Sequence, residues 1–532
     1  MSRKSTTAGP AARVMAAIMG SRVLGLVRDV VLNSIFGASH ALDAFWTAFR
    51  IPNLLRDLLA EGALSVSFTT TFSKKLEKDG KEQAFLLANR MLTSMSVLLV
   101  IICALGIWLS DAIVIHTIGR GFDPDKQMLT IELTRILFPF IIFVSLAAVY
   151  MGLLNSLGSF GLPASASTVF NATSILFGLG FGYLYDPDYG PMAIYGFAWG
   201  TVLGGTMQLI IQMPKAAGYG LTLLPRFDWN NPELIKIYQL SLPAIAGVAA
   251  VQVNVVVNAS WASFMGEGAV TYFNNAFRLM QLPIGMFGVA IGMVTLPSVS
   301  KSVAQENMQQ FRWKVVEGLK LALFLTVPAS LGLCFMAEPI ISVIYEHGRF
   351  SEEDMKATAS LLQAFTLGLA GYACIKVMAP TFYALDMPKV PVMISIRAIG
   401  LNLIFTTVFI KVFDMGLTAL PLSISLVALL NLFQLAFALS RRLGSITTGT
   451  DFPGFFLKMI LLSGVFAALL GLITWGAGSY LDSPLSRGVY LALSVPSFAA
   501  VYFFLAYRLG FDEVDNLLAA IKRKIGRETP EA

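Results

Sequence analysis

Long apolar runs follow one another through nearly the whole chain and restrict what it can fold into. Each run is continuous and about 20 residues or longer, which is the length of a helix that crosses a bilayer. Hydrophobic residues make up 56% of the sequence and charged residues 13%, whereas soluble domains carry roughly 25% charged residues. The runs do not resemble the roughly ten-residue alternating strands of an outer-membrane barrel. We therefore predict an all-α polytopic membrane protein.

The apolar runs predict about fourteen transmembrane helices. By residue number they are 12–36, 41–72, 86–110, 129–155, 161–185, 190–213, 234–264, 269–299, 314–345, 357–385, 390–412, 416–440, 454–480 and 486–508. We expect Pro52 to interrupt the second span. The tail from Asp512 to Arg527 alternates charged and apolar residues, which predicts a short surface helix.

Basic residues gather in alternate loops and in the tail, and loops of this kind face the cytoplasm. In the loops they are Lys74, Lys75, Lys78, Lys81, Lys215, Arg226, Lys301, Arg312, Lys314, Arg441 and Arg442. We therefore expect an even number of spans with both termini in the cytoplasm. Because the net charge of +6 is concentrated in such loops, it does not indicate nucleic acid as a partner. The first apolar run contains arginines and shows no signal-peptide cleavage pattern.

An internal repeat divides the chain. Ala48-Phe49-Arg50 recurs 228 positions later as Ala276-Phe277-Arg278, and Phe45 and Phe273 share this offset. We predict two pseudo-symmetric six-helix lobes plus two C-terminal helices, and transporters built from such repeats bind substrate between the halves. The expected segments are an N-terminal lobe at 1–217, a cytoplasmic linker loop at 218–233, a second lobe at 234–443, two extra helices at 444–510 and a cytoplasmic tail at 511–532.

The first span contains charge that a bilayer-spanning helix does not tolerate without a reason. At 100° per residue, Ser21, Arg22, Gly25, Arg28 and Asp29 fall within an arc of roughly 120°. Each charge costs about 2.5–3.5 kcal/mol on insertion scales, so we expect this face to line a water-filled cavity. The alternative is that Arg28 and Asp29 form a local structural pair while Arg22 snorkels to an interface.

Further charges follow in the second and eighth spans. Arginine binds phosphate oxygens in a bidentate manner and keeps its charge at low dielectric, so several arginines around one cavity suit an anionic, phosphate-bearing substrate. The expected substrate-binding residues are Arg22, Arg28, Arg56, Arg278 and Arg50. The expected cavity carboxylates, which balance the empty cavity or couple transport to a cation or proton, are Asp29, Asp43 and Glu61. Structural ion pairing is the alternative for the carboxylates.

The second half is less charged, because Asn254 and Asn258 stand roughly where Asp29 and Asn33 stand in the first half. The first half is therefore expected to supply most of the anion-binding field. The three cysteines show no CxxC spacing, so neither a disulfide framework nor a metal site is indicated. We expect no cofactor. No GxxxxGK[ST] loop occurs, so the expected energy source is the membrane potential or an ion gradient and not ATP.

Several stretches, spread over nearly the whole chain, resemble the MurJ (MviN) family of lipid II flippases, within the multidrug/oligosaccharidyl-lipid/polysaccharide exporter superfamily. They are Ser21-Arg22-Val23-Leu24-Gly25, Arg28-Asp29, Asp43-Ala44-Phe45, Pro52-Asn53-Leu54-Leu55-Arg56, Ala60-Glu61-Gly62-Ala63, Arg278-Leu279-Met280, Leu296-Pro297-Ser298 and Gly348-Arg349-Phe350.

The resemblance implies two lobes that form a V around a cationic cavity, and two C-terminal helices that flank a groove for a polyprenyl tail. It implies that Arg22, Arg28, Arg56 and Arg278 meet the diphosphate and sugar head group. Gln281 stands where the family often has an acidic residue, so a role for that carboxylate is not carried over. A family sodium site is not assigned either, because the residues available for it are Asn254, Asn258 and Asn402.

By this resemblance we expect a flippase that moves lipid II, or a related polyprenyl diphosphate-linked glycan, across the bacterial inner membrane by alternating access. Membrane lipids and cell-wall synthesis proteins are the expected partners, in peptidoglycan biosynthesis and the maintenance of cell shape. The alternatives are another polyprenyl-linked glycan flippase or a drug exporter of the same superfamily. A membrane transferase acting on lipid diphosphates would need metal-binding aspartates or a histidine acid/base pair, and no such cluster is found, so no enzyme is expected.

Overall fold

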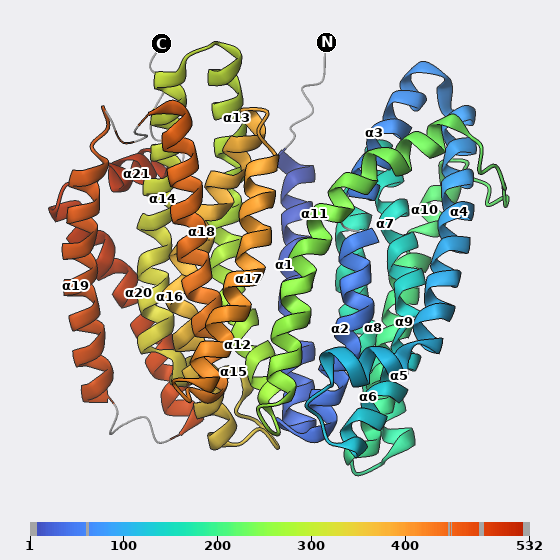
Figure 1. The fold of residues 1–532 in the computed structure, drawn as a ribbon, viewed down its shortest axis with the longest axis horizontal. Helices are drawn as coiled ribbons and strands as arrows, with labels where there is room; N and C mark the ends of the chain where they lie inside the picture. Colours follow the sequence, from blue (N-terminus) through green and yellow to red (C-terminus); the bar gives the residue numbers. More distant parts are fainter. Residues whose placement is uncertain (1–7, 60–62, 445–446, 448, 478–482, 525–532) are drawn as a thin grey trace. The chain divides into compact units, whose positions relative to one another are not determined.

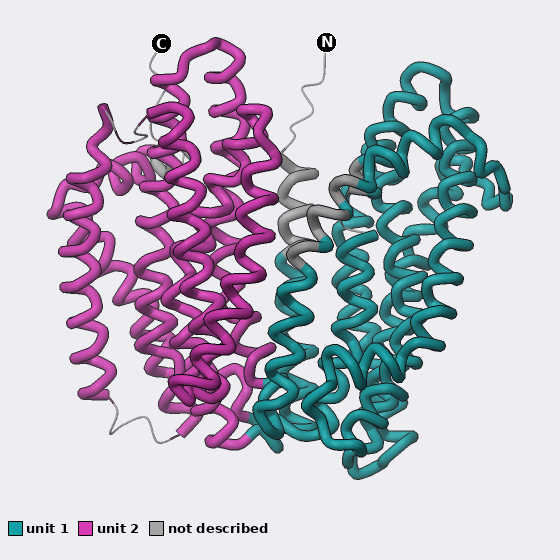
Figure 2. Tube along the Cα trace, viewed as in Figure 1, with its two compact units in different colours: residues 1–271, 347–350 teal, residues 272–346, 351–532 magenta. Residues whose placement is uncertain are grey.

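The protein is built from helices, and no β-strand occurs in the part of the chain that is described (Figure 1). The computed structural model describes residues 8–59, 63–444, 447, 449–477 and 483–524. Contacts divide the chain into two compact units (Figure 2). Unit 1 comprises Met1–Thr271 and His347–Phe350, and unit 2 comprises Tyr272–Glu346 and Ser351–Ala532. The predicted domain boundaries stay predictions.

The first eleven helices belong to unit 1. They are α1 (Ala8–Phe36), α2 (His40–Leu59), α3 (Ala63–Lys78), α4 (Gly80–Trp108), α5 (Ser110–Ile113), α6 (Pro124–Leu137), α7 (Phe140–Ser156), α8 (Gly161–Tyr185), α9 (Ile194–Ile210), α10 (Met213–Gly218) and α11 (Pro232–Ser263). A π-helical turn, η1 (Val114–Ile118), and a 3-10 turn, η2 (Pro191–Ala193), lie between them. The start of α11 follows from its sequence, because the Asn231 side chain accepts from two backbone N–H groups and Pro232 needs no partner there.

The remaining helices form unit 2. They are α12 (Ala269–Pro283), η3 (Ile284–Val289, π-helical), α13 (Ala290–Ala304), α14 (Met308–Phe335), α15 (Ala337–Tyr345), α16 (Glu352–Ala384), α17 (Lys389–Lys411), η4 (Gly416–Thr418, 3-10), α18 (Ala419–Leu443), α19 (Phe452–Ala477), α20 (Pro484–Arg508) and α21 (Asp512–Lys524). The first three residues of α12, 269–271, still belong to unit 1. Helix α21 confirms that the tail contains a short helix.

Among the described residues, 11 helices are long and apolar enough to cross a membrane. The charged helices α1, α2 and α11 are additional to these eleven. The structure is therefore compatible with fourteen spans, and that number stays a prediction. The expected interruption at Pro52 is wrong, because α2 stays helical through Pro52 to Leu59 and α3 begins at Ala63. A proline removes one helical hydrogen bond. Ile51 and Pro52 are buried, and this packing keeps α2 helical despite the missing hydrogen bond.

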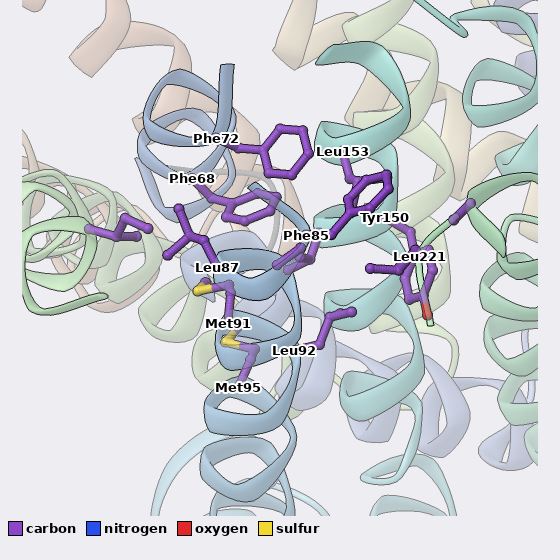
Figure 3. Packing of buried hydrophobic residues seen from close by; sticks show 14 of the residues in the cluster. Phe68, Phe72, Phe85, Leu87, Met91, Leu92, Met95, Tyr150, Leu153 and Leu221 are labelled. Carbon is purple, nitrogen blue, oxygen red and sulfur yellow. The ribbon is translucent and has the colours of Figure 1, made fainter. Parts of the chain in front are cut away.

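The core of unit 1 forms where α3, α4 and α7 meet (Figure 3). Phe68 and Phe72 project from α3 against Phe85 of α4, and all three side chains are buried. Met91 of α4 and Leu153 of α7 extend the same cluster. Burial of side chains of this size stabilises the fold by roughly 1.5–3 kcal/mol each. Helix α3 is therefore held by its aromatic face, which leaves its opposite face for another role.

Glycines bring α8 and α9 into backbone contact. A Cβ atom added to Gly196 would lie 2.1 Å from the backbone nitrogen of Gly182, and one added to Gly200 would lie 2.5 Å from that of Gly178. Helices approach this closely only where side chains are absent, which is the usual role of small residues spaced along membrane helices. The pair forms a rigid wall of unit 1, and α1 packs along α8, where Asn171 donates to the Ser21 carbonyl at 3.1 Å.

In unit 2, α16 packs against α13, α14, α15 and α18. A separate aromatic cluster attaches the last helices. Tyr502 of α20 donates a 2.8 Å hydrogen bond to the Phe324 carbonyl of α14, and Phe511 packs on the Phe324 ring just before α21. The C-terminal helices are thus fastened to α14 by buried aromatic side chains.

Candidate functional site

Arg28 lies in α1 with its guanidinium buried among aromatic rings, and the residue is 8% exposed. Its carbon Cζ lies 5.9 Å from the centroid of the Trp46 ring, 6.0 Å from that of Phe49 and 5.5 Å from that of Phe170. We call Trp46, Phe49 and Phe170 the aromatic cage. Cation–π attraction of this kind contributes about 0.5–2 kcal/mol per contact. The cage fixes the position of the Arg28 charge inside the apolar part of unit 1.

Asp29 supplies the counter-charge to Arg28. The Arg28 Nε and Nη2 atoms donate to Asp29 Oδ1 at 3.3 and 3.2 Å. The local pair considered as the alternative reading therefore exists. The pair neutralises the buried Arg28 charge beside the aromatic cage.

The Asn33 side chain makes the same kind of hydrogen bond in the first half of the chain as the Asn258 side chain makes in the second half. Asn33 donates to the Asp29 carbonyl at 2.7 Å, and the Asn258 side chain donates to the Asn254 carbonyl at 2.8 Å. Each hydrogen bond spans four residues, or one helical turn. The two pairs occupy the positions that the sequence analysis aligned, Asp29 with Asn254 and Asn33 with Asn258. The first half therefore has a buried carboxylate where the second half has an amide.

Arg56 and Arg50 belong to the later part of α2. Arg56 Nη2 donates to Asp57 Oδ1 at 2.8 Å, and Gln252 of α11 donates to Asp57 Oδ2 at 3.2 Å. The Arg56 charge is close enough to Arg28 to repel it, and Arg50 is attracted by Asp57. The structure thus brings Arg28, Arg50 and Arg56 into one electrostatic neighbourhood of unit 1, where Asp57 supplies a counter-charge.

The remaining predicted arginines lie elsewhere. Arg22 is exposed on α1, one turn or more from the cage. Arg278 is half-buried on α12 in unit 2, where its neighbour Phe277 stacks on Phe273 with 6.0 Å between ring centroids. The counterpart pair Phe45 and Phe49 stacks at 6.2 Å in unit 1, so the repeat extends to side-chain packing. Glu61 lies outside the described residues.

Asp43 is completely buried, and its carboxylate accepts four hydrogen bonds. Oδ2 accepts from Lys126 Nζ at 2.7 Å and from the Gly268 backbone N–H at 2.8 Å. Oδ1 accepts from the Thr271 backbone N–H at 2.9 Å and from its hydroxyl at 2.7 Å. Sequence reasoning missed Lys126, since a lysine at the start of a helix far along the chain gives no signal of a buried partner.

Metal binding is not indicated by the geometry. Over the described part of the chain, no group of three or more His, Cys, Asp or Glu side chains is placed to hold an ion. The chemistry that the arrangement offers is electrostatic. Fixed guanidinium groups in apolar surroundings bind phosphate-like anions without any bond being made or broken.

The chain is similar to known proteins over most of its length. Residues 32–495 match the family model described as "Lipid II flippase MurJ". The chain is 32% identical over 502 residues to the lipid II flippase MurJ of Burkholderia cenocepacia, covering 92% of this chain and 95% of that relative. It is 33% identical over 508 residues to the probable lipid II flippase MurJ of Bdellovibrio bacteriovorus, covering 93% and 94%.

Solved structures share the fold. A lipid II flippase MurJ in an inward closed conformation superposes with a TM-score of 0.76 at 24% identity, covering 93% of this chain and 97% of that chain. An inward-facing multidrug resistance transporter of the MATE family, in the MOP superfamily, gives a TM-score of 0.69 at 15% identity, covering 82% and 99%. These likenesses confirm the predicted fold class, an all-α polytopic membrane protein.

Proposed function

The chain belongs to the MurJ family of lipid II flippases, and on this premise we propose that it moves lipid II from the cytoplasmic to the outer leaflet of the bacterial inner membrane. It is a multi-pass membrane transporter, and it does not catalyse a chemical reaction. Lipid II carries the sugar and peptide units of peptidoglycan on a polyprenyl diphosphate, so the protein acts in cell-wall biosynthesis and in the maintenance of cell shape.

The physical problem is to move a charged head group across hydrocarbon, where unpaired polar groups cost several kcal/mol each. Arg28 is the observation that supports our assignment of the site. It is a permanently charged group held in apolar surroundings by the aromatic cage. Its N–H groups would replace water around the diphosphate while the tail stays in lipid.

Arg50 and Arg56 are proposed to add to the field of Arg28 from α2, and Arg22 and Arg278 to bind the head group from α1 and α12. Asp29, Asp43 and Glu61 are proposed to balance the cavity when it is empty or to couple transport to an ion. Alternating access then exposes the bound head group to one side of the membrane at a time, as in other transporters built from repeated lobes.

We propose further that both termini face the cytoplasm, because the loops that are rich in lysine and arginine would then lie inside. The energy source is proposed to be the membrane potential or an ion gradient, with no cofactor. Cell-wall synthesis proteins are the proposed protein partners.

The deciding experiment is complementation in cells depleted of their own lipid II flippase. Wild type, Arg28→Ala and the control Arg442→Ala are expressed to equal levels in the membrane, and lipid II exposed on the outer leaflet is quantified with a membrane-impermeant reagent. Arg442 lies at the end of α18 on an exposed face, so its loss removes the same charge outside the site.

We expect rescue by wild type and by Arg442→Ala, and loss of exposed lipid II with Arg28→Ala. Failure of a well-expressed wild type to rescue would contradict lipid II as the substrate. Full activity of Arg28→Ala would show that Arg28 is structural.

A further inference from the structure

A hollow of about 480 Å³ lies in unit 1 between α3 and the first turns of α11. We call it the α3–α11 hollow. Hydroxyl groups of Ser67 and Thr71 line its wall, together with the side chains of Lys74, Lys78 and Lys236. This volume is large enough for a lipid head group, since ligand pockets begin at about 300 Å³. None of the residues that line the hollow belongs to the site proposed above.

The packing of α3 explains why these side chains face the hollow. Phe68 and Phe72 are one turn apart and are buried against α4 and α7 (Figure 3). Ser67, Thr71, Lys74 and Lys78 are spaced by four, three and four residues, so they form a separate stripe on the helix. Because the aromatic stripe is fixed in the core, rotation of α3 about its axis cannot turn the polar stripe away from the hollow.

The charges around the hollow do not cancel. Lys75 is paired with Glu233 of α11, and its Nζ also donates to Asp79 at 3.3 Å. The hydrogen bond to Glu233 is the main reason why the pKa of the Lys75 ammonium is raised. Within the part of the chain that is described, Lys74, Lys78 and Lys236 have no carboxylate partner. Three ammonium groups therefore remain around a hollow whose two carboxylates are already occupied.

An exposed apolar side chain lies beside the charged end of the hollow. Leu240, one helical turn after Lys236 on α11, lines the hollow and is 55% exposed. Basic groups beside an exposed leucine match the layered chemistry of a lipid, in which a phosphate lies above an acyl or polyprenyl chain. A soluble phosphate ion would use the lysines and leave Leu240 without a partner.

We propose that the α3–α11 hollow binds the phosphate group of an anionic membrane lipid, with Lys74, Lys78 and Lys236 as its ligands and Ser67 as a hydrogen-bond donor. The lipid is either a bulk anionic phospholipid or the diphosphate lipid that the protein transports, since both carry phosphate above a long apolar tail. The proposal relies on the proposed function for the cytoplasmic location of this end of α3 and for the transported lipid as one of the two candidate ligands.

The test is lipid binding to the delipidated full-length protein in detergent, measured by native mass spectrometry. The ligands are phosphatidylglycerol and lipid II, each titrated alone and against inorganic phosphate. The test variant is Lys74→Gln/Lys78→Gln/Lys236→Gln. The control variant is Lys215→Gln/Lys301→Gln/Lys389→Gln, which removes equal charge from exposed positions that the predicted topology places on the same side of the membrane.

We expect the test variant to bind at least one of the two lipids about tenfold more weakly than wild type, and the control variant to bind it within about twofold. A third variant, Lys74→Arg/Lys78→Arg/Lys236→Arg, keeps the charge and should keep the affinity, which separates loss of the site from loss of the fold. Weakened binding of phosphatidylglycerol identifies a phospholipid site, and weakened binding of lipid II alone identifies a loading site for the substrate.

Unchanged binding of both lipids by the test variant would overturn the proposal, as would competition by inorganic phosphate at micromolar concentration, which would indicate a soluble anion. Failure of the flippase assignment is detected separately. Arg28→Ala should bind phosphatidylglycerol at the hollow as wild type does, whatever its effect on lipid II exposure in cells.

Discussion

Asp43 Oδ1 accepts a 2.7 Å hydrogen bond from the hydroxyl of Thr271, a residue 228 positions later in the chain. This is the offset at which the Ala-Phe-Arg motif recurs, so the two residues are counterparts in the repeat. The counterpart of His40 at this offset is Gly268. The carboxylate of Glu267, the residue before it, accepts a 2.9 Å hydrogen bond from the His40 backbone N–H. Asp43 in the first turn of α2 therefore caps the start of α12, and Glu267 just before α12 caps the start of α2. A carboxylate at a helix start is favoured by the helix dipole.

Replacement of Asp43 by Asn should destabilise the protein strongly. The Lys126 ammonium, whose side chain is 4% exposed, would lose its carboxylate partner, and removal of one partner of a buried pair typically costs about 3–5 kcal/mol. The free energy of unfolding measured by chemical denaturation in detergent checks this expectation. The double variant Asp43→Asn/Lys126→Gln should recover part of the loss, and a double variant no more stable than Asp43→Asn would contradict the pairing.

Removal of one ring of the aromatic cage should lower transport more than stability. Phe170→Leu keeps an apolar side chain on α8 but deletes a cation–π contact worth about 0.5–2 kcal/mol, so we expect a several-fold lower rate of lipid II exposure. Phe177→Leu, two turns later on the same helix and without a contact to Arg28, serves as the control. Equal rates for the two variants would show that the ring does not position Arg28.

The contact between α8 and α9 should reject even a methyl group. In Gly200→Ala the new Cβ would meet the Gly178 backbone at 2.5 Å, where neither helix can give way without shifting as a whole. We expect a loss of stability of about 1–3 kcal/mol, comparable to overpacking of a core. Gly180→Ala has open space around it and should be neutral or slightly stabilising, because alanine favours helix by up to about 1 kcal/mol. Thermal unfolding of the two variants in detergent measures the difference.

Glu513 on α21 should make stability depend on pH. Burial is the main reason why the pKa of its carboxyl is raised, so the folded state binds the proton more readily than the unfolded state. The stability that this proton provides is present below the unfolded pKa of about 4.5 and is lost as the pH rises through the folded pKa. Glu513→Gln should therefore unfold at a higher temperature than wild type at pH 7.

The advantage of Glu513→Gln should shrink toward zero at about pH 3, well below the unfolded pKa of about 4.5, where the wild-type carboxyl is protonated in both the folded and the unfolded state. Asp515→Asn, on the same helix with an exposed carboxylate, should give no gain at pH 7. An equal gain from both variants would mean that general charge reduction, and not the burial of Glu513, is responsible.

Helix positions were predictable to within a few residues because apolar length is a local property. The predicted span at 161–185 coincides with α8, and the predicted span at 390–412 differs from α17 by one residue at each end. Where prediction failed, at Pro52, the local preference of proline was outweighed by packing that involves distant parts of the chain. The predicted span at 129–155 becomes two helices separated at Phe138 and Pro139 for a local reason, since proline offers no N–H to continue the ladder.

The sequence by itself determined the all-helical membrane fold, the repeat and the arginine-bearing first two spans, because the cost of charge in hydrocarbon and the 3.6-residue period act within single segments. Only the tertiary structure decided which partner each charge has. Trp46 and Phe170 around Arg28, Lys126 beside Asp43 and Gln252 beside Asp57 come from other helices. These pairings depend on how helices pack in three dimensions, and no spacing along the chain encodes them.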